Sequence, residues 1–201
     1  LSLSISNPLI NMELSKFSIN FFDMYARAKS KSFYYKDVLV LLSNSFLRTV
    51  NEKELKIFET IRQDIVVKNM VYVSSSYILS KLKNKETKKL FNCSQDNILN
   101  VLNECIEIFE LKIKENSFLE QSSKIKSILQ IIKNFNAKYS FKISFDSLKD
   151  FFFDIIKNQS ISYYGDPTHN FHILGLLESR GMDFENVIIC SANEGILPSN
   201  N

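Results

Sequence analysis

The segment from Leu9 to Tyr164 contains neither glycine nor proline. These two residue types interrupt regular structure most strongly, because glycine is conformationally free and proline has no backbone N–H. The segment is instead rich in Leu, Ile, Lys, Glu, Phe and Asn. It therefore predicts successive helices joined by short polar turns. All four glycines lie after it: Gly165, Gly175, Gly181 and Gly195.

Apolar residues within this segment recur at intervals of three and four, which is typical of one face of a helix. Two such stripes are Leu14, Phe17, Phe21, Met24 and Ala28, and then Leu55, Phe58, Ile61 and Ile65. Similar spacing predicts longer helices over about residues 96–115 and 118–136. Residues 36–42 are a short buried helix or strand, and their helical neighbours favour a helix. Residues 70–74 are expected to be extended.

Three positions carry residue types that commonly begin helices. Asn51, with Glu54 three residues later, resembles a capping pair. Ser74 is expected to begin a helical turn, and Ser144 to cap a further helix. The core residues of that last helix are expected to be Leu148, Phe151, Phe152 and Ile155.

Strand-like patterns occur at both ends of the chain. Residues 1–5 alternate apolar and polar side chains, as in a half-buried strand. Residues 161–164, 171–177 and 186–190 are short apolar runs, with a turn expected over 165–170. The last two runs are expected to be buried strands of a parallel sheet covered on both faces. We therefore expect a mainly α chain with a small α/β part, in which residues 9–159 form a helical insertion and residues 1–8 and 160–201 form part of an incomplete sheet.

The composition is that of an ordinary globular chain, with 45% hydrophobic and 23% charged residues and a net charge of +3. Such a mild charge permits contact with a polyanion but does not by itself indicate it. No apolar run approaches the ~20 residues that span a bilayer, so no membrane contact is expected. The three cysteines (Cys93, Cys105 and Cys190) form no CxxC pair and are typical of a reducing compartment, so a cytoplasmic location is expected. The absence of an initiator Met suggests a fragment of a longer protein.

Motifs for catalysis and metal binding are absent from the sequence. There is no GxxxxGK[ST] phosphate loop and no GxSxG nucleophile elbow. The only histidines, His169 and His172, lack the spacing of a metal site. Asp146, Asp150 and Asp154 share one helical face and are expected to form a solvated stripe. We therefore expect no catalytic residue, no metal site and no ATP turnover in this chain.

Residues 81–90 form the most basic stretch of the chain and are flanked by Tyr77 and Phe91. One interpretation is a surface that neutralises nucleic-acid phosphates without reading sequence. The other is a solvated lysine-rich turn with no ligand. The candidate phosphate contacts are Lys81, Lys83, Lys85, Lys88 and Lys89.

Residues 172–201 carry a more specific pattern. Ile173 and Leu174 resemble a buried strand, residues 180–184 (Arg-Gly-Met-Asp-Phe) resemble Lys-Gly-Leu-Glu-Phe, and residues 194–198 resemble a Glu-Gly-x-x-Pro turn. This order resembles motif V and the following strand of superfamily 1 (UvrD/RecB-type) DNA helicases. Gly175 stands where that family usually has Thr, and Leu177 where it usually has His. The segment is closer to the AddB-like, PD-(D/E)xK nuclease family proteins of bacterial double-strand-break resection enzymes. Residues 2–9 and 33–42 also resemble the start of that family's inserted subdomain.

The resemblance implies that residues 1–8 and 160–201 belong to a second RecA-like (P-loop helicase) domain. It implies a DNA-backbone contact at Arg180 and Gly181, and a nucleotide-ribose or motif-coupling role for Asp183. A glycine lets backbone approach an anion closely, and an arginine can bind phosphate in a planar fork. The parent protein would use ATP and Mg²⁺, contact DNA ends or single strands, and join a partner helicase or nuclease subunit. The residues at Gly175 and Leu177 favour a DNA-guiding role over motor activity.

Two further hypotheses remain open from the sequence. The chain could instead be a helical scaffold whose Phe-rich faces dock a partner protein, with no nucleic-acid role. It could also belong to an active motor of the same superfamily whose missing Thr and His roles are supplied by other residues. Salt dependence separates the first two hypotheses, because phosphate contacts weaken steeply with salt and apolar docking does not.

Overall fold

A computed structural model of the 201-residue chain describes residues 2–3, 5–139, 144–163, 172–175 and 179–190. The chain divides into two compact units. The larger unit is Asn7–Ile161, and the smaller one combines Leu1–Ser6 with Ser162–Asn201. The expected mainly helical fold is confirmed, whereas the assignment of the smaller unit to a RecA-like domain stays a prediction.

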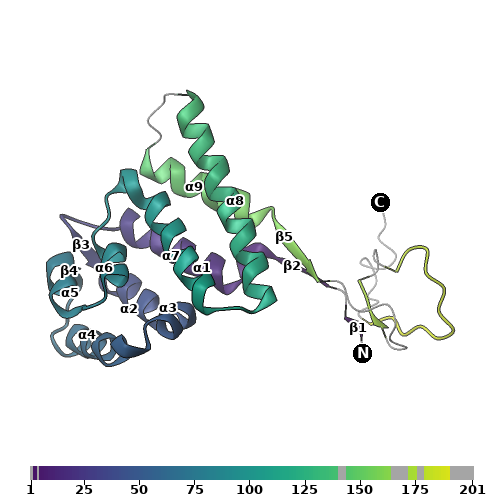
Figure 1. The fold of residues 1–201 in the computed structure, drawn as a ribbon, viewed down its shortest axis with the longest axis horizontal. Helices are drawn as coiled ribbons and strands as arrows, with labels where there is room; N and C mark the ends of the chain where they lie inside the picture. Colours follow the sequence, from purple (N-terminus) through teal and green to yellow (C-terminus); the bar gives the residue numbers. More distant parts are fainter. Residues whose placement is uncertain (1, 4, 140–143, 164–171, 176–178, 191–201) are drawn as a thin grey trace. The chain divides into compact units, whose positions relative to one another are not determined.

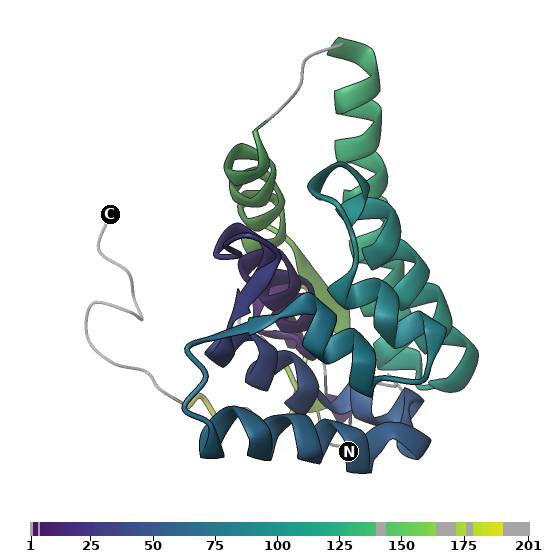
Figure 2. The ribbon, with the colours of Figure 1, turned by 90° about the vertical axis from the view of Figure 1, so that its left-hand side faces the viewer.

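The larger unit consists of helices joined by short connections (Figure 1). Its α-helices are α1 (Glu13–Ala26), α2 (Tyr35–Ser43), α3 (Ser45–Val50), α4 (Leu55–Val67), α5 (Ser75–Lys81), α6 (Lys85–Phe91), α7 (Ile98–Lys112), α8 (Asn116–Tyr139) and α9 (Phe145–Lys157). Three 3₁₀ turns precede helices: η1 (Leu9–Asn11), η2 (Glu52–Glu54) and η3 (Gln95–Asn97). Figures 1 and 2 both show α8 extending beyond the other helices of this unit.

Helix α1 is the centre of the larger unit, and it packs against α2, α8 and α9. Its predicted apolar stripe is confirmed, except that the helix ends before Ala28. Phe17 meets Phe109 of α7 edge to face, with ring centroids 5.2 Å apart. Phe22 meets Phe152 of α9 at 4.7 Å. Burial of such a side chain contributes about 1.5–3 kcal/mol, so aromatic contacts between these helices form much of the core.

Two of the three predicted helix starts are confirmed. The Ser74 hydroxyl accepts a hydrogen bond from the backbone N–H of Tyr77 at 3.2 Å, and the Ser144 hydroxyl accepts one from Ser147 at 3.2 Å. In α9 the fully buried positions are Leu148, Phe152 and Ile156, whereas Phe151 and Ile155 are half-buried. The buried face of α9 is therefore rotated about the helix axis by a fraction of a turn from the face that the sequence predicts.

The predicted capping pair of Asn51 and Glu54 is wrong. Asn51 ends α3, and its side-chain amide donates to the Leu47 carbonyl at 2.9 Å. Glu54 does not reach back to Asn51 but accepts hydrogen bonds from the backbone N–H groups of Lys83 and Asn84. Both side chains are used in contacts that are distant in sequence, which local spacing does not reveal.

One small antiparallel pair of strands lies within the larger unit, beside α5 (Figure 1). Strand β3 (Ser32–Tyr34) pairs with β4 (Tyr72–Ser74), so that Phe33 faces Val73 and Tyr34 faces Tyr72 across the pair. Phe33 and Val73 are 2% and 1% exposed. Because successive side chains of a strand alternate between faces, Tyr34 and Tyr72 lie on the outer face. The extended piece predicted at residues 70–74 is confirmed over Tyr72–Ser74.

The ends of the chain pair with one another through two short strand pairs. Strand β1 (Ser2–Leu3) is parallel to β6 (His172–Ile173), and β2 (Ile5–Pro8) pairs with β5 (Ser160–Tyr163). The chain thus enters the helices along β2 and leaves them along β5, and Figure 1 shows these two strands side by side. The strand expected at 161–164 is confirmed as far as Tyr163, and the expected turn at 165–170 lies outside the described residues.

The buried strand expected at residues 186–190 is wrong in this structure. These residues form no strand, and Val187, Ile188 and Ile189 are 64%, 86% and 60% exposed. A parallel strand is buried only where neighbouring strands and helices cover it on both faces. In the described part of the smaller unit, the strand pairs are β1 with β6 and the ends of β2 and β5, each a separate two-stranded sheet, and such short pairs are too small to cover a further strand.

Candidate nucleic-acid contact surfaces

The basic stretch predicted from the sequence occupies the end of α5, the following turn and α6. Two of its five lysines are engaged by acidic groups. Lys89 Nζ lies 2.8 Å from Glu104 Oε2 and 3.4 Å from Glu86 Oε2. Lys81 Nζ lies 3.9 Å from Asp64 Oδ2 and 5.6 Å from the ring centre of Tyr77. These two lysines are therefore weaker candidates for phosphate contact.

The other three lysines remain candidates. Lys83 and Lys85 are exposed and Lys88 is half-buried. Within the described ranges, none of the three forms an ion pair. Their ammonium groups are therefore available to an anionic ligand.

A polar network that local sequence patterns do not reveal fixes the turn before α6. Glu54, only 4% exposed, accepts the backbone N–H groups of Lys83 at 2.5 Å and Asn84 at 2.7 Å through Oε1. The Asn84 amide donates to Asn51 Oδ1 at 2.7 Å, and the Thr87 hydroxyl donates to the same oxygen at 2.9 Å. Asn84 also caps α6 by accepting from Glu86 N at 2.8 Å. No local signal marks this network, because Glu54 lies in the ordinary charged stretch of residues 52–56.

Asp64 and Tyr77 form a second polar cluster beside this stretch. Asp64 accepts hydrogen bonds from Lys68, at 2.8 Å, and from the Tyr77 hydroxyl. The hydrogen bond from Lys68, followed by that from Tyr77, lowers the pKa of Asp64 below its usual value. Partial burial, together with the neighbouring carboxylate, raises the pKa of Tyr77 to about 12. At neutral pH the cluster therefore holds a carboxylate, a neutral phenol and two ammonium groups.

The Asp64 cluster gives a prediction for the pH dependence of stability. Because the pKa of Asp64 is lowered on folding, its contribution is present above the unfolded value of about 3.9 and is lost as the pH falls through the lower folded value. Asp64→Asn is expected to lower the melting temperature at neutral pH, and the difference from wild type is expected to shrink in acid. Thermal unfolding followed by circular dichroism, from neutral pH down to acid, measures the melting temperatures of wild type and variant.

The matched control for that prediction is Asp150→Asn, because Asp150 is exposed and has no ion pair or hydrogen bond in the described part of the chain. It is expected to leave the melting temperature unchanged at both pH values. If the difference in melting temperature between Asp64→Asn and wild type stays constant throughout the acid range, the stabilising role assigned to the Asp64 carboxylate is contradicted.

The segment that resembles motif V forms a turn in the smaller unit. The N–H of Met182 donates to the Ser179 carbonyl at 3.3 Å. Gly181 has φ +77°, the left-handed region that favours glycine, and a Cβ there would meet no atom within 4 Å. The glycine is thus required by backbone conformation and not by crowding. Arg180 and Asp183 are both exposed.

Arg180 and Asp183 lie three residues apart in this segment. No ion pair joins Arg180 to Asp183 among the described residues, and Glu178 lies outside them. The described structure brings these two residues onto one short turn and leaves both to solvent. It does not place them within a closed pocket.

The other candidate residues, three aspartates and three cysteines, form no catalytic or metal-binding group among the described residues. Asp146, Asp150 and Asp154 are exposed, which confirms the predicted solvated stripe. All three cysteines are free thiols. Burial raises the pKa of Cys93 and Cys105, so both stay protonated and are poor nucleophiles. Over the described ranges, no group of three His, Cys, Asp or Glu side chains is arranged to hold a metal ion, and no helix is long and apolar enough to cross a membrane.

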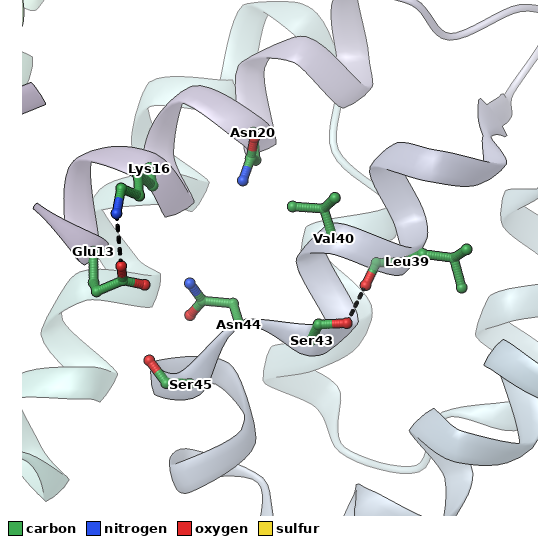
Figure 3. A pocket seen from close by; sticks show the side chains of 8 residues that line it. All are labelled: Glu13, Lys16, Asn20, Leu39, Val40, Ser43, Asn44 and Ser45. Carbon is green, nitrogen blue, oxygen red and sulfur yellow. Dashed lines mark hydrogen bonds and ion pairs between the residues drawn. The ribbon is translucent and has the colours of Figure 1, made fainter. Parts of the chain in front are cut away.

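A shallow depression of about 460 Å³ lies between α1 and the junction of α2 with α3 (Figure 3). Four of its polar side chains already have partners, and the other two are the uncharged Asn20 and Ser45. Lys16 pairs with Glu13 at 2.9 Å, the Ser43 hydroxyl donates to the Leu39 carbonyl, and Asn44 caps α3. The depression presents no nucleophile beside a base, so it offers no basis for catalysis.

Comparisons with protein-family models, with curated proteins and with solved structures found no match. The residues and their geometry therefore carry the functional assignment.

Proposed function

We propose that this chain is part of a helicase-like subunit of an ATP-dependent helicase/exonuclease that processes DNA ends in double-strand-break repair. In this proposal residues 1–8 and 160–201 belong to its second RecA-like domain, and residues 9–159 are a helical insertion in that domain. The chain contributes contacts to the DNA backbone, while ATP, Mg²⁺ and nuclease chemistry belong to other parts of the parent protein and its partner subunit.

The pairing of the two chain ends is the observation that carries this proposal. Strands β1 and β6 are parallel, and the whole helical unit lies between them in the chain. Two parallel neighbouring strands need a crossover connection, because the end of the first strand and the start of the second lie at opposite ends of the pair. A helical unit that leaves and rejoins a sheet along paired strands has the topology expected of an insertion into a parallel α/β domain.

The turn at residues 179–182 supports a backbone contact with DNA. The positive φ of Gly181 lets the backbone adopt a conformation that other residues rarely take. Arg180 beside it is exposed and without an ion pair among the described residues. An arginine fork beside a turn that contains glycine suits a phosphate oxygen.

A second candidate function is a helical scaffold that docks a partner protein. The observation that favours it is the exposed apolar group at the end of α4, where Val66 and Val67 are 65% and 77% exposed and Val71 is 58% exposed. Exposed aliphatic side chains close together are typical of protein contacts. Such docking would change little with salt.

DNA binding by the chain provides the test. We expect a duplex with a single-stranded tail to bind in low salt and to dissociate as salt is raised. Replacing Lys83, Lys85 and Lys88 together by glutamine is expected to reduce the slope of log K against log salt by about 0.7 for each lost contact on a single strand, or about 0.9 on duplex. Fluorescence anisotropy titrations at several salt concentrations measure the slope.

The matched control is Lys89→Gln, since Lys89 lies in the same helix but is held by Glu86 and Glu104. It is expected to change the slope by less than any of the other three. The absence of DNA binding in low salt, or an affinity independent of salt, would reject the DNA proposal and favour the scaffold.

A further inference from the structure

The outer face of the β3–β4 pair gathers aromatic and basic side chains that the proposed function does not use. The rings of Tyr34 and Tyr72, opposite each other in the pair, have centroids 6.0 Å apart. Tyr35, at the start of α2, continues this row, with its ring 4.9 Å from that of Tyr34. Tyr72 is 37% exposed, and the other two are half-buried. Three adjacent rings therefore reach the surface over a pair of strands whose inner face is buried.

Three lysines lie in the chain next to these rings, on the turn before β3 and at the start of α2. Lys29 Nζ lies 5.2 Å from the ring centre of Tyr72. Lys29, Lys31 and Lys36 are exposed, and over the described ranges none of them forms an ion pair. The nearby Asp37 is 7% exposed and already accepts two hydrogen bonds from Arg27, at 2.6 and 3.0 Å. The segments of this face therefore carry three lysines that form no ion pair among the described residues, and the carboxylate that follows Lys36 in the chain is paired with Arg27.

The turn before β3 carries Lys29 and Lys31, whereas Lys36 lies in the first turn of α2. Backbone hydrogen bonds join Lys29 and Ser32 in both directions, at 2.9 and 2.8 Å. The two residues between them, Ser30 and Lys31, have φ values of 45° and 61°. The Lys31 carbonyl then accepts the backbone N–H of Ser75 at 2.9 Å, which ties the turn to the start of α5. Lys29 and Lys31 are thus carried on a turn that is hydrogen-bonded on both sides.

Aromatic rings beside free ammonium groups are the chemistry that binds single-stranded nucleic acid. Bases stack on aromatic side chains whatever their identity, and lysines contact the phosphates between them. A duplex offers no unstacked base face to a ring on a protein surface, whereas a single strand does. An apolar protein segment would use the rings but would leave the lysines without partners.

We propose that this tyrosine–lysine surface (Lys29, Lys31, Tyr34, Tyr35, Lys36 and Tyr72) binds single-stranded DNA by stacking bases on Tyr72 and its neighbouring rings. The proposal rests on the proposed DNA-end-processing function and deepens it, because it names the strand form that the helical unit holds. It assigns phosphate contacts to lysines outside the basic stretch at residues 81–90.

The test compares the affinities of the full chain for two labelled DNA strands. One is an oligothymidylate of about 15 nucleotides, close to the upper site size of small single-strand-binding folds. The other has the same backbone and length, but its central nucleotides lack bases. Wild type is expected to bind the base-bearing strand roughly five- to hundredfold more tightly than the abasic strand, since each stacked base contributes by that factor. Anisotropy titrations at one fixed low salt concentration measure both affinities.

Tyr72→Leu is the deciding variant, because leucine keeps apolar bulk and removes the ring. It is expected to bind the base-bearing strand about five- to hundredfold more weakly than wild type and to lose its preference over the abasic strand. Tyr72→Phe keeps the ring and is expected to stay within about twofold of wild type. Phe153→Leu is the matched control, because Phe153 is a similarly exposed ring on α9, at 39%, and is expected to change neither affinity.

The outcomes separate this inference from the proposed function. Equal binding of both strands by wild type, or an unchanged base preference in Tyr72→Leu, overturns the stacking surface while DNA binding itself stands. No binding of any DNA overturns the proposed function as well. If Tyr72→Leu lowers the melting temperature, the wild-type comparison of the two strands and the Tyr72→Phe variant still decide the question.

Discussion

Phe22→Ala is expected to lower the free energy of unfolding by about 3–5 kcal/mol, the usual cost of removing a buried aromatic side chain. Phe22 is fully buried in α1, and its ring lies 4.7 Å from Phe152 and 6.1 Å from Phe145, both in α9. The substitution removes apolar contacts with both rings and leaves a cavity between α1 and α9. Because α1 packs against most of the neighbouring helices, little relaxation is available to close that cavity.

Urea unfolding followed by circular dichroism measures this effect. The midpoint should fall while the slope of free energy against urea stays the same, because the surface exposed on unfolding is nearly unchanged. Phe153→Ala is the control: Phe153 neighbours Phe152 in the chain but is 39% exposed, so its loss is expected to cost less than about 1 kcal/mol. Equal losses for the two variants would show that α9 does not pack on α1 as described.

Glu54→Ala is expected to lower the free energy of unfolding by about 1–3 kcal/mol, because it leaves two partly buried backbone donors without an acceptor. Glu54 Oε1 accepts the N–H groups of Lys83 and Asn84, and the residue is 4% exposed. No other acceptor is placed to replace that oxygen in the described turn. The same variant should weaken DNA binding, since it releases the turn that carries Lys83 and leads into α6.

Two further variants separate the hydrogen bonds of Glu54 from its charge. Glu54→Gln keeps an oxygen at the Oε1 position, and its amide nitrogen replaces Oε2, a buried atom that has no hydrogen bond within the described structure. It is expected to cost about 1 kcal/mol, less than the alanine variant. Glu52→Ala, at an exposed position in the same 3₁₀ turn, is expected to stay within about 0.5 kcal/mol of wild type. A loss at Glu52 as large as that at Glu54 would contradict the assigned role.

The helices were predictable from the sequence because their signal is local. The stripe of α1 and that of α4 repeat every three or four residues, and each places its apolar side chains on one buried face. The caps at Ser74 and Ser144 follow from the tendency of a serine hydroxyl to accept the free N–H groups of a first helical turn. These features need no information from elsewhere in the chain.

The polar contacts between helices were not predictable in the same way. Asn51 and Glu54 have the spacing of a local cap, yet their side chains contact residues about thirty positions later in the chain. The pairing of Tyr34 with Tyr72, and the position of Lys29 over Tyr72, likewise join segments separated by α2, α3 and α4. Such contacts depend on how the helices pack, and spacing in the sequence does not encode them.

In the candidate site, too, some features follow from local sequence and others depend on contacts between distant segments. The lysines of residues 81–90 were visible as a charge run, but only the positions of Glu86, Glu104 and Asp64 separate engaged lysines from available ones. The hydrophobic run at 186–190 has the composition of a buried strand, yet Ile188 is 86% exposed, because burial of a strand depends on neighbours that the run cannot supply. From the sequence alone, the helices with a clear apolar stripe or serine cap were predictable, since those signals lie within a few residues of one another, whereas the short helices α3 and α6 were not predicted. The tertiary structure decided which charges are paired, which rings are exposed and which strands are covered, since each depends on segments that are distant in the chain.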